Sequence, residues 1–115
     1  MAEPLTAAVF HILLALAPGE RHGYAIMREV AEETGGQFMM GPGTLYGTLK
    51  RMLEAGLVEE CGERADPQIN DERRRYYRIT ARGRHTAEEE ARRLDMLVRL
   101  AKAKSVLGHV RARQS

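Results

Sequence analysis

The sequence predicts a mainly α-helical fold with a small β-hairpin, folded as one compact unit. At 115 residues the chain has a common size for a single domain. Hydrophobic residues make up 43% of the chain and aromatic residues only 5%, so aliphatic side chains and methionine must build most of the core. Apolar residues recur every three or four positions in several stretches, which is typical of helices, and two short stretches have the composition of strands.

The first predicted helix follows Pro4, which a first helical turn tolerates, and ends at Pro18-Gly19. Phe10 and Leu14 give this helix a second apolar side. A helix that is apolar on two sides needs cover on both, so we expect a second subunit to contribute to that cover. The residues of the first apolar side recur at helical spacing and are Val9, Ile12, Leu13 and Leu16.

Two further helices are predicted, from about Gly23 to Glu33 and from about Thr44 to Ala55. Gly35-Gly36 ends the earlier one, and Gly56 suits the left-handed position that follows the later one. Gly47 lies near the centre of the polar face of the later helix. A glycine there costs about 1 kcal/mol of helix stability relative to alanine, which indicates that something approaches this face closely. The polar face consists of Thr44, Gly47, Lys50, Arg51 and Glu54.

Two short strands are predicted at Leu57–Cys61 and Arg75–Ile79, and the polar segment between them indicates a hairpin with a long tip. Thr80 is placed to cap the last helix, which we expect to run from about Ala81 to Leu107 or slightly beyond. Apolar residues of this helix alternate spacings of four and three, the pattern of a helix that packs along another helix. They are Ala87, Ala91, Leu94, Val98 and Ala101.

Three helices followed by a two-stranded hairpin is the order of a winged helix-turn-helix, which we assign to residues 1–80. Residues 81–115 would then form a long C-terminal dimerisation helix. In that fold the third helix enters the major groove of DNA, and basic hairpin residues reach phosphates or the minor groove. The net charge of +2 does not itself indicate a nucleic-acid partner. However, Arg73 to Arg84 contains six arginines and no acidic residue, which gives the hairpin a basic edge.

Four stretches of the chain also match a known family in order, and together they span residues 22–83. They are His22-Gly23-Tyr24-Ala25-Ile26, Gly43-Thr44-Leu45-Tyr46 with Leu49 and Leu53, Glu54-Ala55-Gly56-Leu57-Val58, and Arg75-Tyr76-Tyr77-Arg78-Ile79-Thr80 with Gly83. On these residues the chain resembles the PadR-like transcriptional regulators. The resemblance implies a dimeric winged-helix repressor whose C-terminal helix supplies much of the dimer contact. It also implies DNA contact by Thr44 and Tyr46, at the start of the recognition helix.

The predicted DNA-binding residues lie on the third helix and on the hairpin. Thr44 and Lys50 offer hydrogen-bond donors, and Arg51 can contact a phosphate or a guanine edge. Tyr46 lies at the margin of the apolar stripe, so packing of its ring beside Leu49 or Leu53 is the alternative. The full set is Thr44, Tyr46, Gly47, Lys50, Arg51, Arg73 and Arg74; Arg75 is left out because it shares a strand face with Tyr77.

The predicted dimer interface combines the second side of the first helix with the apolar side of the last one. Some of these residues could instead line a cavity for a small-molecule effector, whose class the sequence does not indicate. Simple packing between subunits is the more economical interpretation. The interface residues are Phe10, Leu14, Leu94, Leu97, Val98, Leu100 and Ala101.

Other classes of function find little support in the sequence. The four histidines and Cys61 include no close pair at metal-ligand spacing, so we expect no metal and no cofactor. Cys61 could sense redox state, although a lone cysteine on a strand is more often a small buried hydrophobe. The chain has no phosphate-binding glycine motif and no nucleophile elbow, so no catalytic residue is expected. The longest apolar run, residues 12–17, is far shorter than the roughly 20 residues that span a bilayer.

Together these observations predict a cytoplasmic homodimer that binds an inverted-repeat operator in double-stranded DNA and represses transcription. No signal-peptide pattern opens the sequence, which favours the cytoplasm. The alternative is a winged-helix module that binds a protein through the same face of the third helix. Added salt distinguishes the two, because phosphate contacts weaken steeply with salt and apolar contacts do not.

Overall fold

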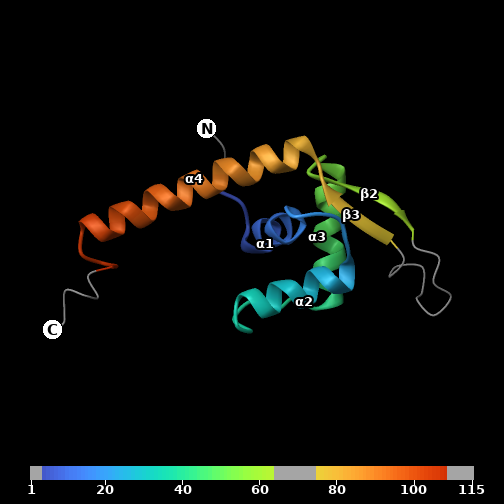
Figure 1. Cartoon of the computed structure of the whole chain (residues 1–115), viewed down its shortest axis with the longest axis horizontal. Helices are drawn as coiled ribbons and strands as arrows, with labels where there is room; N and C mark the ends of the chain where they lie inside the picture. The colour runs from blue at the N-terminus through green and yellow to red at the C-terminus, as the bar shows by residue number, and fades with distance from the viewer. Residues whose placement is uncertain (1–3, 64–74, 109–115) are drawn as a thin grey trace.

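The computed structural model describes residues 4–63 and 75–108 and confirms the mainly α-helical fold with a long C-terminal helix. Figure 1 shows the first three helices gathered beside a small sheet, with the last helix extending well beyond them. No helix among the described residues is long and apolar enough to cross a membrane. The elements are α1 (Ala7–Leu16), β1 (Arg21–His22), α2 (Gly23–Glu33), α3 (Pro42–Glu54), β2 (Val58–Glu63), β3 (Arg75–Ile79) and α4 (Ala81–Ala103).

The core forms where α1, α2 and α3 meet the sheet. The apolar face predicted for α1 is confirmed, because Ile12, Leu13 and Leu16 are completely buried. Ala87 brings the start of α4 against the same core. Ala15 of α1 is buried as well. The remaining buried hydrophobic residues come from the other elements and from the loop before α3, and they are Ile26, Val30, Met40, Leu45, Leu49, Met52, Val58 and Tyr77.

The sheet has three strands where the sequence predicted a two-stranded hairpin. β1 pairs antiparallel with β3, with Arg21 opposite Tyr77 and His22 opposite Tyr76, and the strand order is β1-β3-β2. Two residues are too few to show the alternation that marks a strand, so β1 carried no signal in the sequence. Its effect is to fix the start of α2 to the sheet, since α2 begins at Gly23, directly after β1.

The C-terminal end of α1 is held by two arginines that belong to other elements. No basic residue lies in the last turn of α1. Instead, Arg21 Nε donates to the Ala15 carbonyl at 2.8 Å, and an Arg84 guanidinium nitrogen donates to the Ala17 carbonyl at 3.1 Å. Arg21 also forms an ion pair with Glu29 at 3.1 Å. The last carbonyl groups of a helix have no hydrogen-bond partner within the helix. Here the two arginines bind these carbonyls and thereby connect α1 to β1 and α4.

Two helix ends differ from the sequence prediction. α3 begins at Pro42, two residues before Thr44, because proline suits the first position of a helix. α4 ends at Ala103, earlier than the predicted Leu107. Ser105 has a φ of +64°, and the Val106 N–H donates to the Ala101 carbonyl at 2.8 Å, which reverses the chain. This geometry is common at helix ends, but glycine usually occupies the left-handed position.

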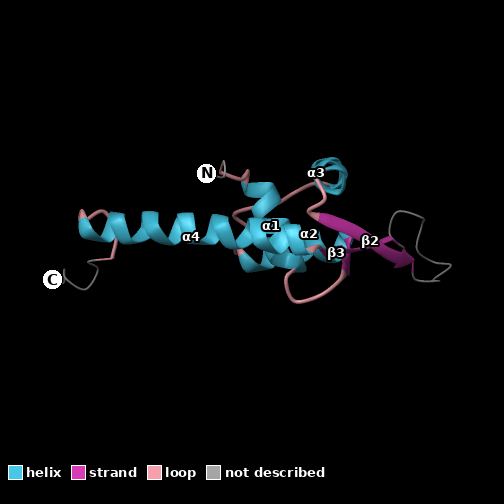
Figure 2. Ribbon diagram, turned by 90° about the horizontal axis from the view of Figure 1, so that it is seen from above, coloured by secondary structure: helices cyan, strands magenta, loops and turns pink. Residues whose placement is uncertain are grey.

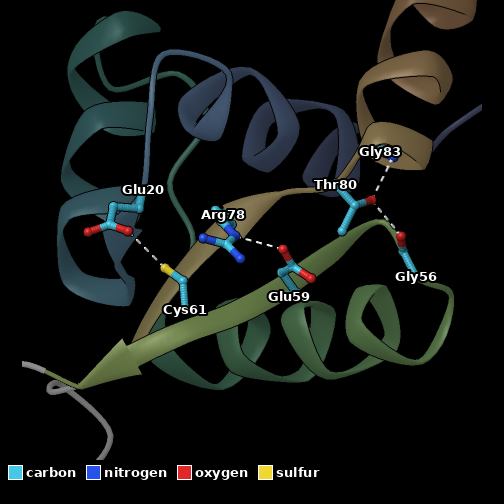
Figure 3. Close-up of polar contacts among 7 residues, drawn as sticks. All are labelled: Glu20, Gly56, Glu59, Cys61, Arg78, Thr80 and Gly83. Atoms are coloured by element: carbon cyan, nitrogen blue, oxygen red, sulfur yellow. Dashed lines mark hydrogen bonds and ion pairs between the residues drawn. The ribbon is translucent and has the colours of Figure 1, made fainter.

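A tight joint connects the sheet to α4. As predicted, Thr80 caps α4: its hydroxyl oxygen accepts from the Gly83 N–H at 2.9 Å (Figure 3). The same hydroxyl donates to the Gly56 carbonyl at 2.6 Å. Gly83 lies so close to the Leu57 carbonyl that no side-chain carbon fits between them. The first turn of α4 therefore packs directly on the backbone that enters β2.

A second attachment fixes α4 further along its length. The Glu90 side chain is only 6% exposed, and its oxygens accept from Arg93 nitrogens at 2.9 and 2.6 Å. Hydrogen bonding from Arg93, together with the backbone N–H of Leu5, lowers the pKa of the Glu90 carboxyl below its ordinary value. A buried carboxylate that is paired in this way joins α4 to the segment that leads into α1.

We expect Gly83→Ala to lower the free energy of unfolding by about 1–3 kcal/mol, because the added methyl overlaps the Leu57 main chain. Gly47→Ala is a matched control, since both glycines are helical and a Cβ at Gly47 meets nothing closer than an Arg51 nitrogen at 3.9 Å. The control should gain up to about 1 kcal/mol from helix propensity. Urea unfolding of both variants measures the difference, and equal stability of Gly83→Ala and the parent would contradict the tight joint.

Candidate nucleic-acid interface

α3 presents the polar face that the sequence predicted. Thr44, Lys50 and Arg51 are exposed, and Gly47 between them is partly exposed. The opposite side is anchored in the core by Leu45, Thr48, Leu49 and Met52, each at most 1% exposed. The structure therefore brings four of the predicted DNA-binding residues together on one accessible helix face.

Packing within the described residues does not require a glycine at position 47. A Cβ at this position would lie in open space, 3.9 Å from an Arg51 guanidinium nitrogen. Arg51 in turn donates to the Thr48 hydroxyl at 3.3 Å, which directs its guanidinium along the helix. Because packing does not require glycine here, the open centre of the face fits the close approach of a partner from outside.

Tyr46 faces the interior of the domain. Its hydroxyl oxygen is buried, and the end of its ring lies directly against Gly23 at the start of α2. The ring also packs against the core cluster, so Tyr46 joins α3 to α2. In this conformation the hydroxyl does not reach the helix surface, and the DNA contact expected from the family resemblance stays a prediction. No periodic pattern in the sequence could have indicated this contact between helices.

The predicted hairpin arginines Arg73 and Arg74 lie outside the described residues. The next arginine, Arg75, opens β3 and is exposed, although the sequence does not predict it as a site residue. Arg78, three residues on, pairs with Glu59 of β2 through an Nε to Oε2 distance of 2.6 Å (Figure 3). An ion-paired arginine offers less charge to a partner, so Arg75 is the more available cation of the strand.

Cys61 does not have the environment of a reactive thiol. Its Sγ donates to Glu20 Oε1 at 3.1 Å, as Figure 3 shows. Partial burial raises the pKa of the Cys61 thiol, and the nearby Arg78 charge only partly offsets this effect. Because the thiolate is the reactive form, the structure gives no support to a redox-sensing role. Within residues 4–63 and 75–108, no group of three or more histidine, cysteine, aspartate and glutamate side chains is arranged to hold a metal.

The residues predicted for a dimer interface are incompletely covered in the single chain. Phe10, Leu94 and Ala101 are partly buried. The other four are exposed, with exposed fractions of 44% for Leu14, 47% for Leu97, 40% for Val98 and 49% for Leu100. Figures 1 and 2 both show the second half of α4 running past the other elements, at the end of the molecule opposite the sheet.

Comparisons with known sequences agree with this architecture. The sequence model of the transcriptional regulator PadR-like family matches residues 12–89. "Transcriptional regulator Rv3488" of Mycobacterium tuberculosis is 37% identical over 101 residues, which cover 86% of this chain and 87% of the relative. An uncharacterized 37.1 kDa protein in transposon TN4556 of Streptomyces fradiae is 38% identical over 80 residues. That match covers 70% of this chain but only 21% of the transposon protein, about a fifth of its length.

Solved structures show the same fold. A PadR family transcription regulator from Clostridium difficile R20291 superimposes with a TM-score of 0.71 at 24% identity, covering 85% of this chain and 97% of the other. Bacillus subtilis PadR, solved in complex with operator DNA, gives a TM-score of 0.64 at 22% identity. That match covers 75% of this chain and 47% of the Bacillus protein.

We expect Cys61 to be alkylated by iodoacetamide with a pH midpoint above that of glutathione, because burial disfavours its thiolate. Arg78→Gln should raise the midpoint further, since the guanidinium charge lowers the pKa of this thiol. Glu59→Gln should lower it, since the carboxylate has the opposite effect. Alkylation rates measured across pH test all three directions, and a parent midpoint at or below that of glutathione would show a reactive thiol instead.

Proposed function

This chain belongs to the transcriptional regulator PadR-like family, and on that premise we propose that it is a homodimeric repressor acting at an inverted-repeat operator. It is a DNA-binding transcriptional regulator rather than an enzyme. The observation that carries the proposal is the exposed polar face of α3, with Gly47 open at its centre. Repression and a cytoplasmic location follow from the same family premise and are part of the proposal.

The α3 face has the chemistry that a DNA major groove requires. Lys50 can neutralise a phosphate, while Arg51 can pair with a phosphate or with the O6 and N7 acceptors of guanine. Thr44, in the first turn, adds a hydroxyl that can donate to the backbone. The operator complex of Bacillus subtilis PadR supports this use of the face, because that protein has the same fold.

The apolar side of α4 supports the dimer. Removing a leucine or valine side chain from water is worth roughly 1.5–3 kcal/mol. Several such side chains on each of two subunits can outweigh an association cost of about 4–15 kcal/mol. Leu97, Val98 and Leu100 each keep 40% or more of their surface exposed in the single chain. A twofold axis through this helix would place two copies of α3 in successive major grooves, about 34 Å apart.

We expect Lys50→Ala and Arg51→Ala each to weaken DNA binding and to lower the salt slope by about 1, because each removes a phosphate contact. The target is the duplex that the chain selects from a random-sequence pool, and fluorescence anisotropy at several salt concentrations gives the slope. Arg92→Ala, which removes an exposed cation from α4, is the control and should leave the slope unchanged.

If both α3 variants keep the salt slope of the parent while the dimer is intact, this face is wrongly assigned to DNA binding. If the affinity of binding through this face does not change with salt concentration, the alternative function is favoured, a module that binds a protein.

We expect Leu97→Glu combined with Val98→Glu to prevent dimer formation and to abolish specific operator binding. A charge buried without a partner loses its hydration and gains nothing in return. Arg92→Glu changes the net charge by the same amount, on the side of α4 away from Leu97 and Val98, and should stay dimeric. Sedimentation and DNA binding are measured on the same samples. A double variant that remains dimeric would place the interface elsewhere, and a folded monomer with parental affinity would remove the need for a dimer.

A further inference from the structure

A surface hollow of about 460 Å³ lies between α2 and the segment that leads into α3. On α2 its lining residues recur at helical spacing and form a second face of the helix, beside the core face of Ile26 and Val30. One face of α2 therefore packs on the core, while the other borders an open hollow. The lining residues are Tyr24, Met27, Arg28, Ala31, Met39, Met40 and Pro42.

The walls of this hollow are mostly apolar, and part of that apolar surface is open to solvent. Three of the chain's six methionines line it. Met39 is 73% exposed, whereas Met40 beside it is only 8% exposed and anchors the segment in the core. Methionine side chains adapt to the shape of a partner, and tyrosine, methionine and arginine are enriched where proteins bind each other. The lining therefore has the composition of a protein-binding surface.

The electrostatics of the hollow favour an acidic partner. Among the described residues that line it, Arg28 is the only charged one, and it is exposed. Within the described part of the chain, Arg28 forms no side-chain ion pair or hydrogen bond. The first turns of α2 and α3, which begin at Gly23 and Pro42, contain no acidic residue that would offset the positive ends of their helix dipoles. The acidic residues of α2 occupy its second half, and none of them lines the hollow.

We propose that this hollow is a docking site for an acidic segment of another protein, which places one bulky apolar side chain in the hollow and a carboxylate beside Arg28. A carboxylate can pair with both ends of the guanidinium fork, and burial of the apolar side chain removes the methionine surface from water. A DNA phosphate would also pair with Arg28, but the DNA backbone has no apolar group that fills such a hollow. The proposal goes beyond the DNA-binding function and does not rest on it.

The hollow is separate from the two surfaces assigned to DNA and to the second subunit. Figure 1 shows α1 between α2 and α4, and α1 packs against both helices. Pro42 opens α3, but Thr44, Lys50 and Arg51 of its polar face do not line the hollow. A segment docked here would therefore leave both the apolar side of α4 and the polar face of α3 accessible.

A peptide selection tests which chemistry the hollow prefers. The probe is a display library of random peptides about 12 residues long, selected on the full chain without DNA. Counter-selection on Met39→Gln removes an apolar wall without changing the charge, so it does not itself favour acidic peptides. Enriched peptides should combine a leucine, methionine or aromatic residue with two or more acidic residues. Enrichment of basic or uncharged peptides, or of none that distinguishes the parent from Met39→Gln, would overturn the proposal.

Substitutions of Arg28 locate the binding of the most enriched peptide, which is synthesised with a fluorophore and followed by anisotropy. Arg28→Glu should weaken binding at least about tenfold, because an attractive pair of charges becomes a repulsive one, and Arg28→Gln should weaken it less. Arg92→Glu changes the net charge of the chain as Arg28→Glu does, but on α4, and should bind the peptide as the parent does. Circular dichroism establishes that each variant is folded. If both folded Arg28 variants keep the parental affinity, the peptide binds elsewhere and the proposal is wrong.

Two further measurements identify other occupants of the hollow. Sedimentation compares the parent with Arg28→Glu, and an assembly larger than a dimer that only the parent forms would assign the hollow to a second copy of this chain. Anisotropy with the selected duplex measures the salt slope of DNA binding. If Arg28→Gln lowers this slope by about 1 and no peptide is enriched, the hollow belongs to the DNA interface. Either result would overturn the proposal, whereas a chain that binds no DNA would refute the proposed function and leave the peptide result unchanged.

Discussion

The burial of α1 is the constraint on which the rest of the structure depends. Ile12, Leu13 and Leu16 have no exposed surface, and α2, α3, α4 and β3 all pack against this helix. Arg21 and Arg84 satisfy the carbonyl groups at its C-terminal end and thereby attach β1 and α4 to it. Since both α3 and α4 rest on α1, the direction of one helix relative to the other is fixed within the chain. In a dimer built through α4, this rigid relation would set the distance between the two DNA-reading helices.

Periodicity predicted most of the fold because α1, α2 and α3 bury apolar faces, and because apolar residues recur at helical spacing along α4. The Thr80 cap was also predictable, because it is a local interaction. The Thr80 hydroxyl and the Gly83 N–H that it binds are only three residues apart. The errors concern features without a repeating pattern. β1 is two residues long, and the end of α4 depends on a left-handed Ser105, a conformation that glycine would have signalled and serine does not.

The candidate site likewise has features that the sequence could predict and features that it could not. The exposed residues of α3 follow from the position of its buried stripe, so the exposure of Lys50 and Arg51 could be predicted from the sequence. The inward direction of the Tyr46 hydroxyl could not, because it depends on contact with Gly23, which precedes Tyr46 by more than twenty residues and belongs to another helix. The sequence does not predict Arg75 as a site residue, because it shares a strand face with Tyr77. The structure shows that this face borders a cavity beside α3, where an arginine can stay exposed next to buried residues.

The positions of the exposed α3 face and of the apolar side of α4 determine whether both can be occupied at the same time. The apolar half of α4 and the sheet lie at opposite ends of the molecule (Figure 2), so a partner subunit bound to α4 would leave α3 open to DNA.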